Sequence, residues 1–212
     1  AVSAGLIPFS IGTETYGSII SPSTVCGVTG LRPTYGRVSR KGAMALSWSM
    51  DKIGPICRTS EDLAIVFSAI IGADNKDQTI YTVPFIYNPD IDLKKLRIGY
   101  LKNDFDKQYD FHKNDSIAIS VLLKLGVELI PIKLPEFPVN DLAIILSAEA
   151  AAAFDELTRS NKDDLMVRQI KNAWPNSFRA SRFIPAVEYI NANRIRYLLI
   201  QEMKNILKEG SF

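Results

Sequence analysis

The sequence predicts an α/β fold, a layered mixed β-sheet flanked by helices. Short apolar segments that are typical of strands alternate along the chain with segments whose apolar residues recur at helical spacing. The 212 residues are 47% hydrophobic and 23% charged, a balance typical of a globular protein. A chain of this length is long enough to enclose one sizeable core.

The first expected elements are a strand and a short helix. Residues 6–11 form an apolar run that predicts a buried strand, interrupted near its start by Pro8. Ser21 and Pro22 then predict the cap and the first position of a helix, which Gly27 soon ends.

The middle of the chain predicts two helices and two strands. Thr59 begins a sequence typical of a capping box, and the helix that follows is expected to close at Gly72. Strands are expected at residues 96–101 and 127–132, and between them a helix that Asp115 opens.

The last third predicts two longer helices. One runs from Asp141 through residues 148–154, where an alanine run favours close helix packing. The other begins at Pro185 and carries a wide apolar stripe. Core packing explains the stripe; alternatively, it marks a surface that a further strand covers.

Residues 12–19 (Gly-Thr-Glu-Thr-Tyr-Gly-Ser-Ile) crowd small and hydroxyl-bearing side chains around Ser18. Nearby glycines allow sharp bends that could turn several backbone N–H groups toward one point. A serine at such a point is a candidate nucleophile beside an oxyanion hole. The alternative from local structure alone is an ordinary capped turn.

These residues resemble the amidase signature family. Residues 12–19 match its Gly-Thr/Ser-Asp-Thr-Gly-Gly-Ser-Ile pattern, and residues 26–40 match Cys-Gly-x-x-Gly-Leu-Lys-Pro-Thr-x-Gly-Arg-Val-Ser. Residues 48–55 are similar to the family's Ser-Leu-Asp-x-x-Gly-Pro. The resemblance is greatest to stand-alone amidases and to the A subunit of glutamyl-tRNA amidotransferase. It implies an amidase-signature fold that is incomplete at both ends, as one partial domain over residues 1–212 with a signature segment at 5–55 and a remainder at 56–212.

The resemblance implies that Ser18 is the nucleophile of an amidase that forms an acyl-enzyme. The backbone N–H groups of Thr15, Tyr16, Gly17 and Ser18 would stabilise the oxyanion. The family's base is a lysine that acts through a second serine in a cis peptide bond, and both lie upstream of the signature. We therefore expect them to be missing from this chain, and we expect the chain alone to be inactive.

Three positions depart from the family pattern. Glu14 stands in place of Asp, Tyr16 in place of Gly and Ile20 in place of Arg. We expect the side chain of Tyr16 to restrict the acyl group. Two downstream lysines, Lys41 and Lys52, are expected to be exposed rather than buried against the nucleophile.

The sequence disfavours other catalytic centres. His112 is the only histidine and is expected on an exposed connection, so a Ser-His-Asp triad is not predicted. Cys26 and Cys57 are expected to be buried thiols, although their number alone allows a disulfide. Their spacing predicts no metal site, and no cofactor is expected.

The formal net charge of +2 gives no indication of nucleic-acid binding. The densest basic cluster is expected to be a solvated helix face and comprises Arg179, Arg182, Arg194 and Arg196. No apolar run reaches the length of a membrane span and no signal peptide is visible, so we expect a cytoplasmic protein. The expected partner is a small-molecule amide, and a homo-oligomer is left open.

Three functions are therefore weighed. The first is a serine-dependent amidase. The second is the A subunit of a tRNA-dependent amidotransferase. The third is a non-catalytic relative that serves as a binding or structural subunit.

Overall fold

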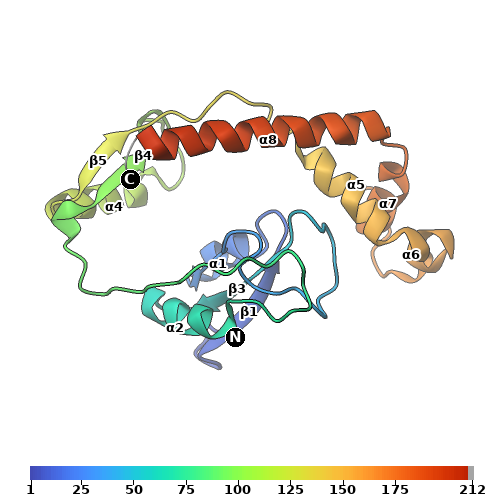
Figure 1. The fold of residues 1–212 in the computed structure, drawn as a ribbon, viewed down its shortest axis with the longest axis horizontal. Coiled ribbons are helices and arrows are strands. Elements are labelled where there is room, and N and C mark those ends of the chain that lie inside the picture. The colour runs from blue at the N-terminus through green and yellow to red at the C-terminus, as the bar shows by residue number, and fades with distance from the viewer. Residues whose placement is uncertain (210–212) are drawn as a thin grey trace. The chain divides into compact units, whose positions relative to one another are not determined.

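The computed structural model describes residues 1–209, which fold into two compact units (Figure 1). Unit 1 contains residues 1–87 and 143–189. Unit 2 contains residues 88–142 and the chain from Ile190 on. The single partial domain expected over residues 1–212 stays a prediction, and so does its incompleteness at either end.

Unit 1 contains a three-stranded antiparallel sheet with the order β1-β3-β2. Its strands are β1 (Phe9–Glu14), β2 (Thr29–Gly30) and β3 (Lys52–Cys57). In the register between the two longer strands, Gly12 lies opposite Gly54. The centre of the sheet therefore has no side chains at this point, and the space is open to a neighbouring residue.

Pro55 lies within β3 although this strand is central in the sheet. Proline cannot donate to a strand ladder, so its usual place is a sheet edge. Here its carbonyl oxygen accepts the N–H of Leu31 at 3.0 Å, and the residue faces Ile11 across the ladder. Pro55 therefore still takes part in the sheet, as a hydrogen-bond acceptor.

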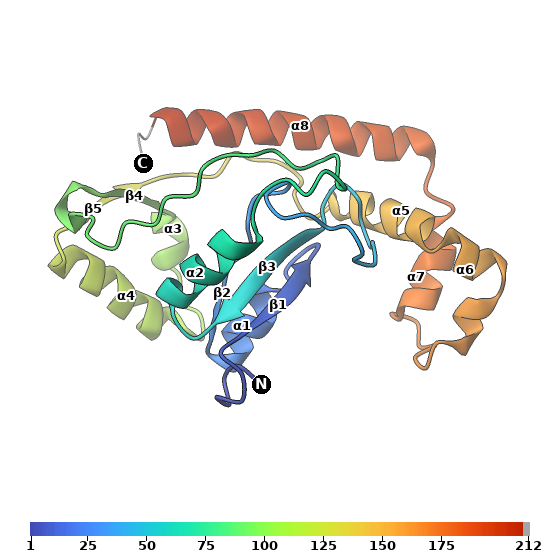
Figure 2. The same cartoon turned by 60° about the horizontal axis from the view of Figure 1, so that its bottom comes forward.

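The helices of unit 1 come from both of its segments (Figure 2). They are α1 (Ile20–Cys26), α2 (Ser60–Ile70), α5 (Ala143–Ala153), α6 (Asp155–Arg159) and α7 (Trp174–Ser181), with a 3-10 turn η2 (Lys162–Leu165). The predicted cap of α2 is confirmed, because the hydroxyl oxygen of Thr59 accepts the N–H of Asp62 at 3.1 Å.

Unit 2 contains a two-stranded parallel sheet. Its elements are η1 (Leu93–Lys95), β4 (Arg97–Tyr100), α3 (Lys102–Phe105), α4 (His112–Lys124) and β5 (Glu128–Pro131). The last helix, α8 (Ala186–Glu209), begins in unit 1 and continues into unit 2. The two strands predicted here and the final helix are confirmed, and the α/β class with them.

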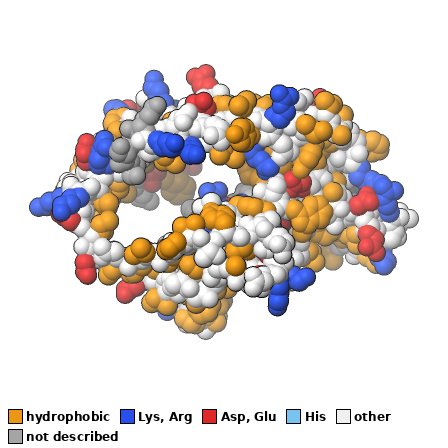
Figure 3. Space-filling model, viewed as in Figure 1, with side chains coloured by type: hydrophobic (Ala, Val, Ile, Leu, Met, Phe, Trp, Pro, Cys, Tyr) orange, Lys and Arg blue, Asp and Glu red, His pale blue; other side chains and the backbone are white. Residues whose placement is uncertain are grey.

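The expectation of a buried first strand is wrong for this chain. Phe9 and Ile11 in β1 are exposed, and Leu6 before it is 77% exposed. β1 is an edge strand paired only with β3, and its faces are incompletely covered by the described residues. Figure 3 shows hydrophobic side chains on the visible surface of the molecule.

Helix boundaries account for two further corrections. α1 begins at Ile20 rather than after a Ser21 cap. α4 begins at His112, which is therefore partly buried in a helix and not on an exposed connection. The imidazole ring packs edge-on against Tyr109, with ring centroids 5.6 Å apart.

The arginines expected to share one solvated helix face do not share a helix. Arg179 lies in α7 and forms an ion pair with the buried Asp163 at 2.6 Å. Arg182 follows α7 and pairs with Asp155 at 2.9 Å. Arg194 and Arg196 lie in α8. The two arginines of this set that belong to unit 1 are therefore engaged by acidic partners.

The two cysteines are free, and they differ in exposure. Cys57 is fully buried, as expected, whereas Cys26 is exposed at the end of α1. The expectation of two buried thiols is therefore wrong for Cys26.

The alanine run of α5 packs closely, as predicted. Ala150 and Ala151 are buried. The helix ends at Ala153, earlier than expected, and Phe154 stacks on Phe178 of α7 with ring centroids 4.5 Å apart. This contact joins the end of α5 to α7 within unit 1.

Candidate active site

Ser18 lies in the loop between β1 and α1, and its side chain is exposed. Gly17, which precedes it, has φ of +125°. Side chains rarely adopt this backbone conformation, so glycine is favoured here. The chain bends at this glycine, directly before the serine.

Ile19 fixes the position of Ser18 because its side chain is completely buried in the sheet. Its atoms lie 3.2 Å from where a Cβ would stand on Gly12, 3.0 Å for Gly30 and 3.2 Å for Gly54. Each of the three strands therefore contributes a glycine to the surface on which this isoleucine packs. We call these three residues the glycine floor.

Glu14 holds the backbone on the other side of Ser18. Its buried carboxylate accepts the N–H of Ile19 at 2.9 Å and that of Ile20 at 3.0 Å. The guanidinium of Arg32 lies 3.9 Å from the second carboxylate oxygen. The residue that departs from the family pattern thus caps α1 in place of the predicted Ser21.

Asp51 holds the beginning of the same loop. One of its carboxylate oxygens accepts the hydroxyl of Thr15 at 2.5 Å. The other accepts the N–H groups of Leu46 and Ser47 at 2.8 and 3.0 Å. The aspartate therefore ties the loop before Ser18 to the segment that leads into β3.

Lys52 is half-buried, and the expectation that it is exposed is wrong. Its ammonium group donates to the carbonyl oxygen of Thr15 at 3.2 Å and to that of Met50. Burial, followed by the nearby guanidinium of Arg32, lowers the pKa of Lys52 below its ordinary value of 10.5. Lys41 is exposed, as predicted.

Within residues 1–209, the backbone N–H groups of Thr15, Tyr16, Gly17 and Ser18 donate to no other protein group. An oxyanion hole requires donors without a protein partner, and of these four residues Thr15 and Ser18 line the pocket described below. Their role in catalysis stays a prediction.

The side chain of Tyr16 is 59% exposed and does not line the pocket that contains Ser18. The described residues thus lend no support to the expectation that Tyr16 restricts the acyl group.

Ser18 lines a pocket of about 520 Å³, which we call the serine pocket. Its walls come from β1, β3 and the long loop segments of unit 1. Hydroxyl groups are contributed by Thr13, Thr15 and Thr79, and the lysines 41 and 52 line the same space. The structure therefore brings together Ser18, Thr15 and Lys52 in one concave site.

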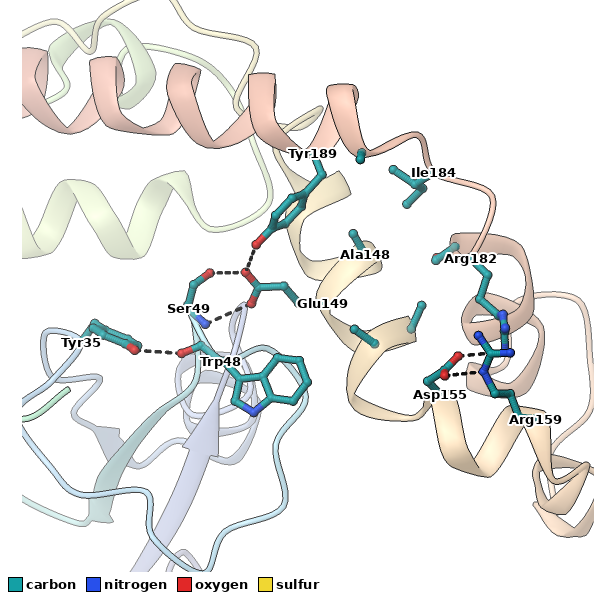
Figure 4. A pocket seen from close by; sticks show the side chains of 14 residues that line it. Tyr35, Trp48, Ser49, Ala148, Glu149, Asp155, Arg159, Arg182, Ile184 and Tyr189 are labelled. Carbon is teal, nitrogen blue, oxygen red and sulfur yellow. Dashed lines mark hydrogen bonds and ion pairs between the residues drawn. The ribbon is translucent and has the colours of Figure 1, made fainter. Parts of the chain in front are cut away.

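A larger pocket of about 880 Å³ lies between the signature segment and helices α5 and α7 (Figure 4). Glu149 lies on its wall, with hydrogen bonds from the hydroxyl groups of Ser47, Ser49 and Tyr189 at 2.5, 2.7 and 2.8 Å. The N–H of Ser49 adds a fourth, at 3.0 Å. Burial would raise the pKa of Glu149, but these hydrogen bonds outweigh it and leave the pKa below its ordinary value of 4.5.

The larger pocket has no candidate nucleophile with an oxyanion loop beside it among the residues that the structure describes. At its other end Asp155 is paired with Arg159 at 2.6 Å and with Arg182 (Figure 4). Its charged groups are thus engaged, Asp155 by the two arginines and Glu149 by neutral donors. We take the smaller serine pocket as the candidate active site because it contains the reactive groups. Trp48 lines both pockets.

Two other kinds of site are absent from the part of the chain that the structure describes. Residues 1–209 bring together no three His, Cys, Asp or Glu side chains that could hold a metal ion. Over the same residues, no helix combines the length and the apolar character needed to cross a bilayer.

Comparison with known proteins identifies the family of this chain. The family model described as Amidase matches residues 1–209. The chain belongs to the amidase family. The resemblance predicted from residues 12–40 is thereby confirmed.

Curated relatives of this amidase-family chain include the A subunits of amidotransferases. Over 159 residues it is 41% identical to the glutamyl-tRNA(Gln) amidotransferase A subunit of Staphylococcus epidermidis, an alignment that covers 72% of this chain and 33% of the relative. It is 43% identical over 162 residues to the same subunit of Roseiflexus castenholzii, covering 72% of this chain and 32% of the relative. The chain thus spans about a third of the length of these relatives.

Solved structures show the same fold. An amidase family protein from Bacillus anthracis str. Ames has a TM-score of 0.81 and 28% identity, covering 100% of this chain and 46% of that one. The peptide amidase of Stenotrophomonas maltophilia has a TM-score of 0.79 and 26% identity, covering 100% and 49%. The predicted amidase-signature fold is therefore confirmed.

Proposed function

We propose that the complete protein is an amidase that cleaves a carbon–nitrogen bond with Ser18 as its nucleophile. The proposal is carried by one observation: Ser18 lines a pocket and stands next to four backbone N–H groups that have no protein partner in residues 1–209. Membership of the amidase family supports the class of reaction.

The proposed reaction has two half-steps. The hydroxyl oxygen of Ser18 bonds to the amide carbonyl carbon, the C–N bond breaks, and the amine leaves with the proton taken from the serine. Water then attacks the resulting ester, which releases a carboxylic acid and restores the serine hydroxyl. In both steps the N–H groups of Thr15, Tyr16, Gly17 and Ser18 would stabilise the oxyanion.

A serine hydroxyl needs a base within hydrogen-bond reach to act at neutral pH. We propose that this base is a lysine acting through a bridging serine, both from outside residues 1–212. Lys52 is not assigned this role, because its ammonium group donates to the carbonyl oxygens of Thr15 and Met50. The chain of 212 residues alone is accordingly proposed to be inactive.

A second candidate is the A subunit of a tRNA-dependent amidotransferase. The observation in its favour is the 41–43% identity to proteins of that description. In that case the leaving ammonia would be passed to an acceptor, and partner subunits would be needed. Ser18 would attack the amide in the same way.

The test uses the complete protein and a fluorophosphonate that forms a covalent bond with activated serines. Wild type should be labelled, and Ser18→Ala should not be. Amide hydrolysis by Ser18→Ala should fall by a factor of about 10⁴ to 10⁶, with an unchanged circular dichroism spectrum. The matched control is Ser21→Ala, an exposed serine three residues further along, which should be labelled like wild type.

Equal labelling of wild type and Ser18→Ala would overturn the proposal. Formation of the carboxylic acid without free ammonia, on addition of an acceptor that becomes amidated, would favour the amidotransferase. Hydrolysis by residues 1–212 alone that disappears in Ser18→Ala would show that a sufficient base lies within this chain.

A further inference from the structure

The serine pocket carries more positive than negative charge. The lining residues with a formal charge are Arg40, Lys41, Lys52, Lys76, Asp51 and Asp77. A concave site lined by one sign of charge raises the local concentration of ligands of the opposite sign. The net field depends on whether the acidic residues neutralise the basic ones.

The two carboxylates are already engaged with other protein groups. The Nε of Arg40 lies 3.0 Å from the carboxylate of Asp77, which also accepts the backbone N–H of Arg40 at 3.1 Å. Asp51 accepts the hydroxyl of Thr15 and two backbone N–H groups. Arg40 and Asp77 thus cancel one another. Asp51 keeps its negative charge, but the three lysines of the lining outnumber it.

The three lysines are not neutralised in this way. Within residues 1–209, no ion pair includes Lys41, Lys52 or Lys76, whereas Arg40 on the same wall has one. Lys52 donates only to carbonyl oxygens, which carry no net charge. Lys41 and Lys76 are exposed at the pocket, so their ammonium groups can move to meet a ligand.

We propose that the amide cleaved at Ser18 carries a carboxylate in its acyl portion, bound by Lys41 and Lys76. The proposal rests on the function proposed above and names its class of substrate. The acyl portion stays attached to the serine through both half-steps, so the walls beside Ser18 act on it throughout. Lys52 adds positive potential from deeper in the pocket while it holds the Thr15 carbonyl.

The experiment measures binding, so that it does not depend on turnover. The complete protein with Ser18→Ala is titrated calorimetrically with succinamate and with butyramide, two primary amides of similar length of which only the first carries a carboxylate. Succinamate should bind about tenfold to a hundredfold more tightly, since hydrogen bonds between charged groups are the stronger ones. The ratio of the two dissociation constants is the readout.

Variants locate the effect. Lys41→Ala and Lys76→Ala should each reduce the preference for succinamate over butyramide. The Lys41→Glu, Lys76→Glu double variant should bind 4-aminobutyramide, which carries an ammonium group in place of the carboxylate, more tightly than succinamate. The matched control is Lys133→Ala, an exposed lysine in unit 2, which should keep the wild-type ratio. Circular dichroism of each variant checks that it is folded.

Equal affinity for succinamate and butyramide, or no binding of either, overturns the inference. So does an advantage for succinamate that survives in the Lys41→Ala, Lys76→Ala double variant. Fluorophosphonate labelling of Ser18 in the wild type is independent of this result. A labelled serine with no preference for succinamate would therefore leave the amidase proposal standing and reject only the substrate class.

Discussion

The ammonium group of Lys52 donates a hydrogen bond to the carbonyl oxygen of Thr15 at a distance of 3.2 Å. In a trans peptide the C=O of one residue and the N–H of the next point in opposite directions. Holding the Thr15 carbonyl toward Lys52 therefore turns the N–H of Tyr16 away from Lys52. The lysine thus sets the direction of one proposed oxyanion donor.

The first prediction is that Lys52→Met in the complete protein lowers kcat for a neutral amide about tenfold to a hundredfold, with a smaller change in KM. Methionine keeps a long, unbranched side chain but cannot hold the carbonyl, so the loop is less well positioned. Lys52→Arg should recover part of the loss. Lys133→Met, far along the chain and exposed, serves as the control. A change confined to KM would contradict the positioning role.

The second prediction concerns Glu14. Glu14→Ala removes the acceptor of the Ile19 and Ile20 N–H groups, at a cost of about 1–3 kcal/mol for each donor left unsatisfied. Glu14→Gln retains an acceptor oxygen and should lose less. The measurement is the free energy of unfolding in denaturant. If Glu14→Ala were no less stable than the exposed control Glu136→Ala, the capping role would be wrong.

The third prediction compares two glycines of the floor. A Cβ on Gly54 would collide with the backbone carbonyl oxygen of Leu31, which has little freedom to move. The atoms nearest to a Cβ on Gly12 would belong to the side chains of Ile19 and Ile56, at 3.2 and 3.4 Å. Gly54→Ala should therefore cost more stability than Gly12→Ala, with overpacking expected to amount to about 1–3 kcal/mol. Thermal unfolding of both variants decides it, and equal losses would refute the argument.

The fourth prediction concerns acid. The pKa of Glu149 in the folded state lies below its ordinary value of 4.5, so the ionised form favours folding. That contribution is complete above about pH 4.5 and is lost as the pH falls through the folded-state pKa. Glu149→Gln should therefore lower Tm at pH 7, and the difference from wild type should shrink in acid. A difference that is constant from pH 7 into acid would contradict the prediction.

The candidate site could be predicted from sequence where its residues are contiguous along the chain. Residues 12–40 indicated the family because their glycines and hydroxyl groups are contiguous, whereas the role of Ser18 as nucleophile stays a prediction. Lys52 was predicted to be exposed, since nothing around it in the sequence shows that its ammonium group meets Thr15. That contact exists only because β1 and β3 pair, which places Glu14 opposite Lys52.

The fold was predicted least well where residues distant in sequence determine the local conformation. β3 contains Gly54 and Pro55, which favour a turn when read locally, but the ladder on both sides keeps the segment extended. The start of α1 was placed at Ser21 because serine is a good cap, whereas the side chain of Glu14 reaches the first turn from six residues before Ile20. The capping preference of Ser21 was therefore overridden by the carboxylate of Glu14.

The glycine floor also separates two groups of residues in the site, those that position Ser18 and those that only line the pocket, and mutagenesis of substrate range should target the second group. Ile19 follows Ser18 directly, so a substitution in the glycine floor that moves Ile19 would also move Ser18. Variants of the floor are therefore expected to lose activity rather than to change substrate. Met44 and Gln78 line the same pocket, and within residues 1–209 neither forms a side-chain hydrogen bond with the loop before Ser18. Diversity placed there would explore substrate range while the geometry of the serine stays constant.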